Sequence, residues 1–176
     1  EGATAQYQDK KMIKIRETSC IKSGKILGIS KFEFLKFPDM RLNDVSHLEL
    51  NQELETVIKK FKPDVIYTCP SNDLNKDHQQ VFESTLVASR PFKNTVKSIL
   101  SYEIPSIVKT PFLPTVYEDI SKEISFKIKA FKCYKSEVEQ FPHPRSIPVI
   151  KSLSILRGME SGLMAAESFQ LIRHIS

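Results

Sequence analysis

The stretch Tyr67–Pro91, YTCPSNDLNKDHQQVFESTLVASRP, joins a short apolar run to a polar turn and then to a segment of helical period. The apolar run at 63–68, PDVIYT, is typical of a buried strand in a parallel sheet. Residues 77–90 have the spacing of an amphipathic helix. A strand, a turn and a helix in this order predict a βα unit, and in such folds ligands bind beyond the C-terminal ends of the strands. The polar turn therefore lies where a site is expected.

The alternation of strands and helices extends along the rest of the chain. Further helices are predicted at 8–23, 47–61, 122–137, 146–157 and 163–175. Further strands are predicted at 31–37, 96–104 and 115–120. Ser121 is expected to cap the helix that follows it, and Gly158 and Gly162 to separate the last two helices. The pattern predicts an α/β fold with a Rossmann-like three-layer α/β/α arrangement and a mostly parallel sheet. With no internal repeat or linker, residues 1–176 are expected to form one domain.

The composition narrows the class of protein. Of the 176 residues, 40% are hydrophobic and 27% are charged, as in ordinary soluble globular proteins. No run approaches the ~18 apolar residues of a membrane span. The net charge of +5 comes from scattered lysines without interleaved aromatic residues, which favours a solvated surface over a nucleic-acid site. Three widely spaced cysteines predict a reducing, cytoplasmic setting and argue against a disulfide framework or a zinc–cysteine site.

The polar turn has two interpretations. In the first, Asp73 or Asn75 caps the helix and His78 is an ordinary surface residue of its first turn. In the second, His78 offers an imidazole nitrogen to a metal, and Asp73 and Asp77 supply carboxylates that orient the ligand or act in acid–base steps. One histidine does not make a metal site, so the spacing leaves both interpretations open. The turn at Pro38–Asp39 and the loop after residue 104 are expected at the same edge of the sheet.

A second constellation is FPHPRS at 141–146, where two prolines stiffen the chain around His143 and Arg145. A rigidly placed histidine and arginine suit recognition of a polar or anionic group, or stabilisation of a developing oxyanion. The alternative is an exposed turn between two helices. His47 and His174 are expected on the surfaces of helices. Glycine-rich phosphate loops and a nucleophile elbow are absent from the sequence.

Taken in order along the chain, a set of segments closely resembles the PIG-L/LmbE family of metal-dependent N-deacetylases. These segments are IRETSCIKSGKILGI, LKFPDMRL, FKPDVIYTCPSNDLNKDH, SYEIP, KIKAFKCYKSEVEQFPHPRS and RGMESGLMAAESFQLIR. The resemblance implies a zinc ion at the C-terminal edge of a Rossmann-like sheet. There it would activate water to attack the acetyl group of an N-acetylated sugar or sugar conjugate. Neither a nucleic-acid partner nor an integral membrane segment is expected. An oligomer is compatible with this resemblance.

The resemblance also implies roles for individual residues. The last histidine of the family's His-Pro-Asp-His motif, a zinc ligand, falls on His78, and the aspartate of that motif falls on Asp77, expected in a catalytic role. The first histidine of the motif falls on Asn75, so His143 is expected to polarise the carbonyl and stabilise the oxyanion in its place. Substrate-binding roles are expected for five residues. These are Arg16, Asp39, Asp73, Asn75 and Arg145.

The sequence departs from the family at its start. The family's Ala-His-Pro-Asp-Asp-Glu motif, which supplies two zinc ligands and the general base, does not occur. EGATAQY resembles the loop after the second strand, so roughly 40 to 60 residues are expected to be missing. Without them, an apolar groove is expected between the strands near 32–37 and 64–68. The chain alone is expected to aggregate or to be only partly structured, and to be inactive. The alternatives are a non-catalytic sugar-binding relative and an unrelated α/β ligand-binding domain.

Overall fold

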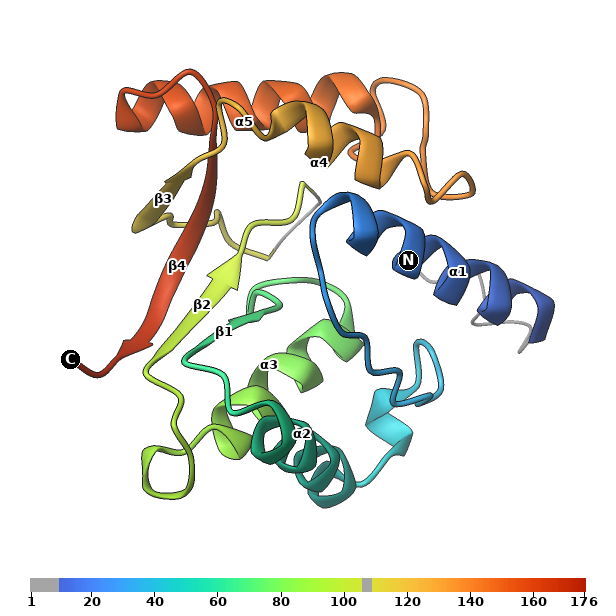
Figure 1. Cartoon of the computed structure of the whole chain (residues 1–176), viewed down its shortest axis with the longest axis vertical. Helices are drawn as coiled ribbons and strands as arrows, with labels where there is room; N and C mark the ends of the chain where they lie inside the picture. Colours follow the sequence, from blue (N-terminus) through green and yellow to red (C-terminus); the bar gives the residue numbers. More distant parts are fainter. Residues whose placement is uncertain (1–9, 106–108) are drawn as a thin grey trace. The chain divides into compact units, whose positions relative to one another are not determined.

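The computed structural model of the chain describes residues 10–105 and 109–176 (Figure 1). The segment EGATAQY, interpreted above as a loop, lies outside these residues. The described elements follow in chain order: α1 (Lys10–Ile26), η1 (Leu42–Asp44), α2 (His47–Phe61), β1 (Val65–Thr68), α3 (Lys76–Ala88), η2 (Pro91–Lys93), β2 (Ser98–Tyr102), β3 (Val116–Asp119), α4 (Ile124–Phe131), α5 (Ile147–Ser161) and β4 (Ala166–His174). Helices and strands alternate through the middle of the chain, so the predicted α/β class is confirmed.

The described strands form a mixed four-stranded sheet in the order β1-β2-β4-β3. β1 and β2 are parallel, with Val65 opposite Ser98. β2 and β4 are antiparallel, with Tyr102 opposite Phe169 and a register shift between Ile99 and Leu100. The sheet is therefore mixed rather than mostly parallel. Because β1 and β2 run in the same direction, their C-terminal ends lie at the same edge, as the predicted site requires.

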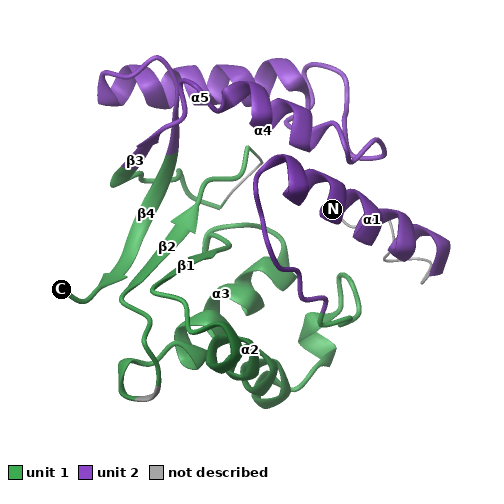
Figure 2. Cartoon of the chain, in the orientation of Figure 1, with its two compact units in different colours: residues 1–5, 35–116, 168–176 green, residues 6–34, 117–167 purple. Residues whose placement is uncertain are grey.

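The chain divides into two compact units (Figure 2). In the described structure, unit 1 contains residues 35–105, 109–116 and 168–176, and unit 2 contains residues 10–34 and 117–167. The expectation that the chain forms one domain stays a prediction.

The core of unit 1 joins α2 and α3 to the parallel strands. Ile58 of α2, Ala88 of α3, and Val96 and Ile99 at β2 form one buried cluster. α2 has the predicted bounds because its apolar residues recur at helical spacing. It ends at Phe61, and the next residue, Lys62, adopts the left-handed conformation with φ 47°. In Figure 1, α2 and α3 lie side by side, and α3 also contacts β1.

The strand predicted at 31–37 is wrong. None of these residues pairs with a strand in the described structure, and the segment is irregular. Lys36 has φ 60°, a left-handed conformation that interrupts an extended strand. Alternating phenylalanines suggested a strand, but a strand needs a hydrogen-bonding neighbour, and no described strand pairs with this segment. The expected groove between two strands therefore loses one of its walls.

The helix predicted at 163–175 is also wrong, because residues 166–174 form β4. Its backbone pairs with β2, which buries Ala166, Ser168 and Phe169. His174, expected on a helix, is an exposed strand residue whose Nδ1 lies 2.9 Å from the Ser98 hydroxyl. Pairing with a neighbouring strand overrides the helical propensity of this alanine- and glutamate-containing segment.

Three helices make up most of unit 2. α4 contacts both α1 and α5 (Figure 1). α4 is shorter than predicted, and Ser121 does not cap it; the Ser121 hydroxyl donates to Asp119 at 2.5 Å. Gly158 lies inside α5 rather than between helices. A Cβ at this position would come within 2.6 Å of the Leu163 carbonyl oxygen, so only glycine fits here without a shift of the backbone. α5 ends at Gly162, which has φ 75°.

Candidate functional site

The polar turn of unit 1 begins where β1 ends, and its geometry is set by side chains that bond to the turn's own backbone. Asn75 is the N-cap of α3, and its side-chain oxygen accepts the Asp77 N–H at 2.8 Å. That bond satisfies one of the donors that a helix leaves free at its N-terminus. The helix-cap interpretation is thus confirmed for Asn75. The cap fixes the start of α3 and so the place of His78 in its first turn.

Asp73 is the buried centre of the turn, with a relative exposure of 4%. One carboxylate oxygen accepts the Asn75 N–H at 2.8 Å, and the other lies 2.7 Å from Nδ1 of His78. The Gln79 side-chain amide donates to the Asp73 carbonyl oxygen at 2.6 Å. Both carboxylate oxygens are therefore occupied inside the turn, which favours an orienting role for Asp73 over the substrate contact expected from the sequence.

The contact with Asp73 decides which His78 nitrogen can bind a ligand. An ionised carboxylate only accepts hydrogen bonds, so the proton of the neutral imidazole sits on Nδ1 and a lone pair remains on Nε2. Metal-bound histidines in proteins almost always have this arrangement, in which a carboxylate or carbonyl holds the second nitrogen. The His78 side chain is 33% exposed, so the ring is not closed off from a ligand.

Two further segments are tied to the polar turn by hydrogen bonds. Asp77 accepts the backbone N–H of Leu42 at 3.0 Å, which fixes the start of η1, just after Pro38–Asp39, against α3. On the other side, the Asn72 side chain donates to the Thr110 carbonyl at 2.6 Å. The expectation that the loop after residue 104 reaches this edge is confirmed for Thr110. For the turn at Pro38–Asp39 the expectation stays a prediction, because the contact is made by Leu42, three residues beyond Asp39. Asp39 itself is exposed.

A thiol–phenol pair beside the turn was missed by the sequence reasoning. Cys69 follows β1, Tyr102 ends β2, and the Cys69 Sγ lies 3.0 Å from the Tyr102 hydroxyl oxygen. Burial raises the pKa of both side chains, and the negative charge of Asp73 acts in the same direction. Both groups are therefore neutral near pH 7. The parallel register of Thr68 with Ser101 would have indicated the pairing, but no sequence pattern gives that register.

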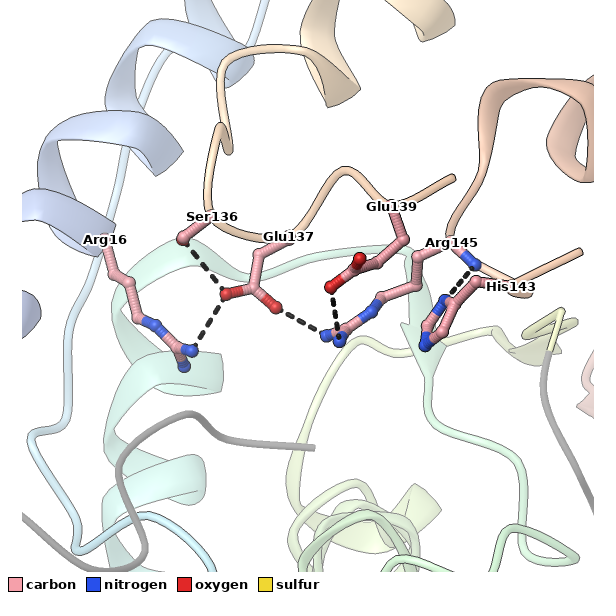
Figure 3. A network of polar contacts seen from close by, with 6 residues as sticks. All are labelled: Arg16, Ser136, Glu137, Glu139, His143 and Arg145. Carbon is pink, nitrogen blue, oxygen red and sulfur yellow. Dashed lines mark hydrogen bonds and ion pairs between the residues drawn. The ribbon is translucent and has the colours of Figure 1, made fainter. Parts of the chain in front are cut away.

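In unit 2, a carboxylate bridges two arginines from distant parts of the chain (Figure 3). Nη2 of Arg16, in α1, lies 2.9 Å from one oxygen of Glu137, and Nη1 of Arg145 lies 2.5 Å from the other. The Ser136 hydroxyl donates to the first oxygen at 3.1 Å. Arg16 and Arg145 were both predicted as site residues, and the structure brings them together through Glu137, which was not.

The FPHPRS turn holds His143 in the opposite way to His78. The Arg145 backbone N–H donates to Nδ1 of His143 at 3.0 Å. An N–H can donate only to a nitrogen that carries no proton, so the proton of the neutral ring is on Nε2. His143 is half-buried and presents this Nε2–H as a hydrogen-bond donor. A donor is the group that an oxyanion requires.

The described residues do not by themselves form a metal site. Across residues 10–105 and 109–176, no group of three or more histidine, cysteine, aspartate or glutamate side chains could hold a metal ion. Catalytic zinc usually has three protein ligands and one open position. His78 fits one of those ligands, and the structure describes no other. The three cysteines are free thiols. Among the described helices, none has both the length and the hydropathy to cross a membrane.

Comparison with protein families gives a match to the model described as "PIG-L: GlcNAc-PI de-N-acetylase", over residues 1–89 of 176. One curated relative is an uncharacterized deacetylase, YaiS, of Escherichia coli. It is 37% identical over 121 residues, which cover 64% of this chain and 60% of that protein. The matched region thus spans about three fifths of the length of this relative.

Solved structures with the same fold include a conserved protein of Thermus thermophilus, at 21% identity and a TM-score of 0.75, covering 93% of this chain and 75% of that one. An N,N'-diacetylchitobiose deacetylase of Pyrococcus horikoshii follows, at 17% identity and TM-score 0.73, with coverages of 91% and 64%. A 4-carboxy-2-hydroxymuconate hydratase of Pseudomonas putida matches at 14% identity and TM-score 0.71, with coverages of 99% and 78%. Because a hydratase shares the fold, these structures establish the architecture and not the reaction.

Proposed function

Because the chain belongs to the PIG-L family of GlcNAc-PI de-N-acetylases, we propose that it is part of a metal-dependent N-deacetylase. The substrate would be an N-acetylated sugar or sugar conjugate, and the products acetate and a free amine. The E. coli relative is described as a deacetylase, and the P. horikoshii protein as a deacetylase of N,N'-diacetylchitobiose. These descriptions support an amide of an amino sugar as the class of substrate.

The observation that carries the proposal is the contact between His78 and Asp73. Asp73 is buried, His78 is partly exposed, and 2.7 Å separates Nδ1 from the carboxylate oxygen. A buried carboxylate that holds one imidazole nitrogen fixes the ring and leaves the other nitrogen as a basic ligand. An ordinary surface histidine does not need a buried carboxylate to hold one of its ring nitrogens. We therefore assign Nε2 of His78 as one zinc ligand.

Zinc, when bound, would supply a water made acidic enough to attack an amide carbonyl near neutral pH. The remaining ligands and the general base would come from residues that the structure does not describe. This chain's own contribution is to hold His78 and to position Asp77. Asp77 stays fixed between the first turn of α3 and the Leu42 N–H, where it orients the neighbouring backbone.

We further propose that His143 donates its Nε2–H to the carbonyl oxygen of the substrate as negative charge develops there. The side chain of Asn75, at the position of the family's first motif histidine, is already used as the cap of α3. His143 has the required proton because Arg145 bonds to its other nitrogen. Arg16 and Arg145 would bind hydroxyl or anionic groups of the sugar. The predicted cytoplasmic location also remains part of this proposal.

A second candidate is a non-catalytic relative that binds the sugar without turning it over. One observation favours it. Asn75 stands where the family has a histidine, and its side-chain oxygen is committed to the Asp77 N–H. If His143 does not replace the missing group, the site would bind an amide but would not polarise it.

The experiment that separates the two candidates measures acetate release and sugar binding by the full-length protein. N,N'-diacetylchitobiose is the first substrate to test, with zinc present. The enzyme hypothesis expects turnover that His78→Ala abolishes and His47→Ala leaves intact, since His47 is an exposed histidine of α2. Calorimetric binding of the sugar without acetate release would support the non-catalytic candidate. Equal activity in His78→Ala and wild type would contradict the assignment of the ligand.

A further inference from the structure

Glu137 lies between the side chains of Arg16 and Arg145 in unit 2 and accepts hydrogen bonds from both. Its two oxygens accept from Arg16 at 2.9 Å and from Arg145 at 2.5 Å, and its side chain is only 17% exposed (Figure 3). The two arginines are 129 positions apart in the sequence. Their guanidinium groups would repel each other at this spacing, and the carboxylate between them reverses that repulsion. Glu139 lies 4.0 Å from Arg145 and adds a second, more exposed carboxylate beside the cluster.

The two arginine side chains depend on this carboxylate because they are not simply solvated. The side chains of Arg16 and Arg145 are 28% and 30% exposed. The Nε atom of each is buried and has no hydrogen-bond partner among the described residues. A buried cation is costly once its partner is removed. Loss of Glu137 is therefore expected to release both side chains from their present directions.

The same carboxylate holds the FPHPRS turn. Arg145 is bonded at three points: its side chain to Glu137, its carbonyl oxygen to the Glu139 N–H at 3.3 Å, and its own N–H to Nδ1 of His143 at 3.0 Å. The Ser146 N–H then donates to the His143 carbonyl at 2.9 Å. Arg145 therefore connects the two contacts: Glu137 holds its side chain, and its backbone N–H makes the hydrogen bond that fixes the tautomer of His143.

We propose that Glu137 is a positioning residue that acts through Arg145. It sets the directions of the Arg16 and Arg145 guanidinium groups, and it holds the turn in which His143 keeps its proton on Nε2. The value of this arrangement for catalysis rests on the proposed deacetylase function. The hydrogen-bonded arrangement of Glu137, Arg145 and His143 does not depend on that function, so it can be tested without measuring turnover.

Hydrogen exchange of backbone amides in the full-length protein tests the structural part. Glu137→Gln keeps the size of the side chain but loses its charge. We expect it to accelerate exchange at the amides of Arg145 and Ser146 by about tenfold to a hundredfold, the range for a hydrogen bond to a charged group. Amides of α2 in unit 1 should be unaffected. Glu139→Gln is the matched control, because the Glu139 side chain is 44% exposed and lies 4.0 Å from Arg145.

Three exchange results would overturn the proposal. Uniform acceleration across the protein would make Glu137 a general stabilising residue, and an equal effect of Glu139→Gln would show that any nearby negative charge suffices. Retained protection at Arg145 in Glu137→Gln would show that the turn holds itself. None of these hydrogen-exchange measurements requires the protein to be an enzyme. A failure of the proposed function would show itself in a different measurement, as the absence of acetate release by the wild type.

A kinetic cycle tests whether Glu137 acts through Arg145. Glu137→Gln alone should lower kcat/KM by about tenfold or more, as expected for a lost charge-assisted hydrogen bond. In the background of Arg145→Met, the same change should cost clearly less than it does in the wild type, because residues of one network are not additive and only the contact of Glu137 with Arg16 then remains to be lost. Additive losses in the double variant, in a protein that does release acetate, would overturn the positioning role while leaving the deacetylase function in place.

Discussion

Asp73→Asn changes one atom of the buried carboxylate that holds His78, and it tests the assigned zinc ligand directly. The carboxylate now accepts from the Asn75 N–H with one oxygen and from the His78 ring with the other. An amide has one oxygen and one NH₂ group. If the oxygen stays on the Asn75 N–H, the NH₂ group faces Nδ1 and must donate to it. The ring proton then moves to Nε2, and the lone pair is lost from the side that would bind zinc.

The expected loss of zinc affinity is larger than the expected loss in the free energy of unfolding. Changing the carboxylate behind a metal-bound histidine typically costs 10- to 100-fold in metal affinity, or about 1.4 to 2.7 kcal/mol. Folding should lose less, because the amide can still satisfy both of its neighbours once the ring has changed tautomer. We expect the free energy of unfolding to fall by about 1 kcal/mol or less, whereas an unsatisfied buried group would cost about 1 to 3 kcal/mol.

The assay is a zinc titration of the full-length protein against a chromophoric chelator, with urea unfolding of the metal-free protein measured in parallel. The matched control is Asp64→Asn, in the same unit, because the Asp64 side chain is 73% exposed. Zinc affinity of Asp73→Asn equal to that of the wild type would refute the reasoning. It would show that Asp73 is a structural turn residue and that the interaction with His78 has no bearing on metal binding.

The remaining predictions concern the oxyanion donor, the helix cap and a buried phenol. His143→Ala should lower kcat about a hundredfold or more; a change confined to KM would instead indicate uniform binding. Asn75→Ala should cost about 1 kcal/mol of folding stability by urea titration, and Asn75→Asp should restore most of it, because either side chain caps a helix; a neutral Asn75→Ala would contradict the cap. Burial and a hydrogen bond to Cys20 raise the pKa of Tyr134 from 10.0 to about 12. The folded state therefore binds this proton more tightly than the unfolded state, so the stability it adds is present below pH 10 and is lost between pH 10 and 12. Tyr134→Phe should lack this loss in pH-dependent melting, and an unchanged profile would refute the assignment.

The parts of the fold that the sequence predicted are those in which local pattern and tertiary pairing agree. α2 begins at His47 and ends at Phe61, as its apolar spacing indicates. β1 and α3 follow within two residues of their predicted bounds. In each case the buried face of one element meets the buried face of its neighbour in the chain. A sequence pattern reports such faces directly, because the residues that form them are close in sequence.

The wrong secondary-structure predictions concern segments whose structure depends on pairing with a strand far away in the sequence. Residues 166–174 contain good helix formers, yet they form a strand because β2 offers a free edge about 70 positions earlier in the sequence. Residues 31–37 have a strand pattern, yet they pair with no described strand. The pattern of a segment describes which faces it can bury. It does not reveal whether a neighbour is present to receive its backbone hydrogen bonds.

The candidate site shows the same division between local and distant contacts. The sequence pointed to Asp73, Asn75 and His78 together because they lie within six residues, and the structure brings them into one hydrogen-bonded turn. Glu137 was missed because its partner Arg16 is 121 positions away. A glutamate in a lysine-rich segment gives no signal of its own. Its role becomes visible only when both arginines are found on its two oxygens.

The chemistry of the two histidines could not have been predicted from their motifs, because the sequence does not show which ring nitrogen is occupied. His78 faces an acceptor, the Asp73 carboxylate, so a lone pair is left for a cation. His143 faces a donor, the Arg145 N–H, so a proton is left for an anion. A neutral imidazole can be a ligand or a hydrogen-bond donor, and the partner of its second nitrogen makes the choice. Exchanging these partners would leave a histidine at both positions but reverse what each can do. The environment of each ring, rather than the residue type, is therefore what supports the proposals that His78 is a metal ligand and that His143 is an oxyanion donor.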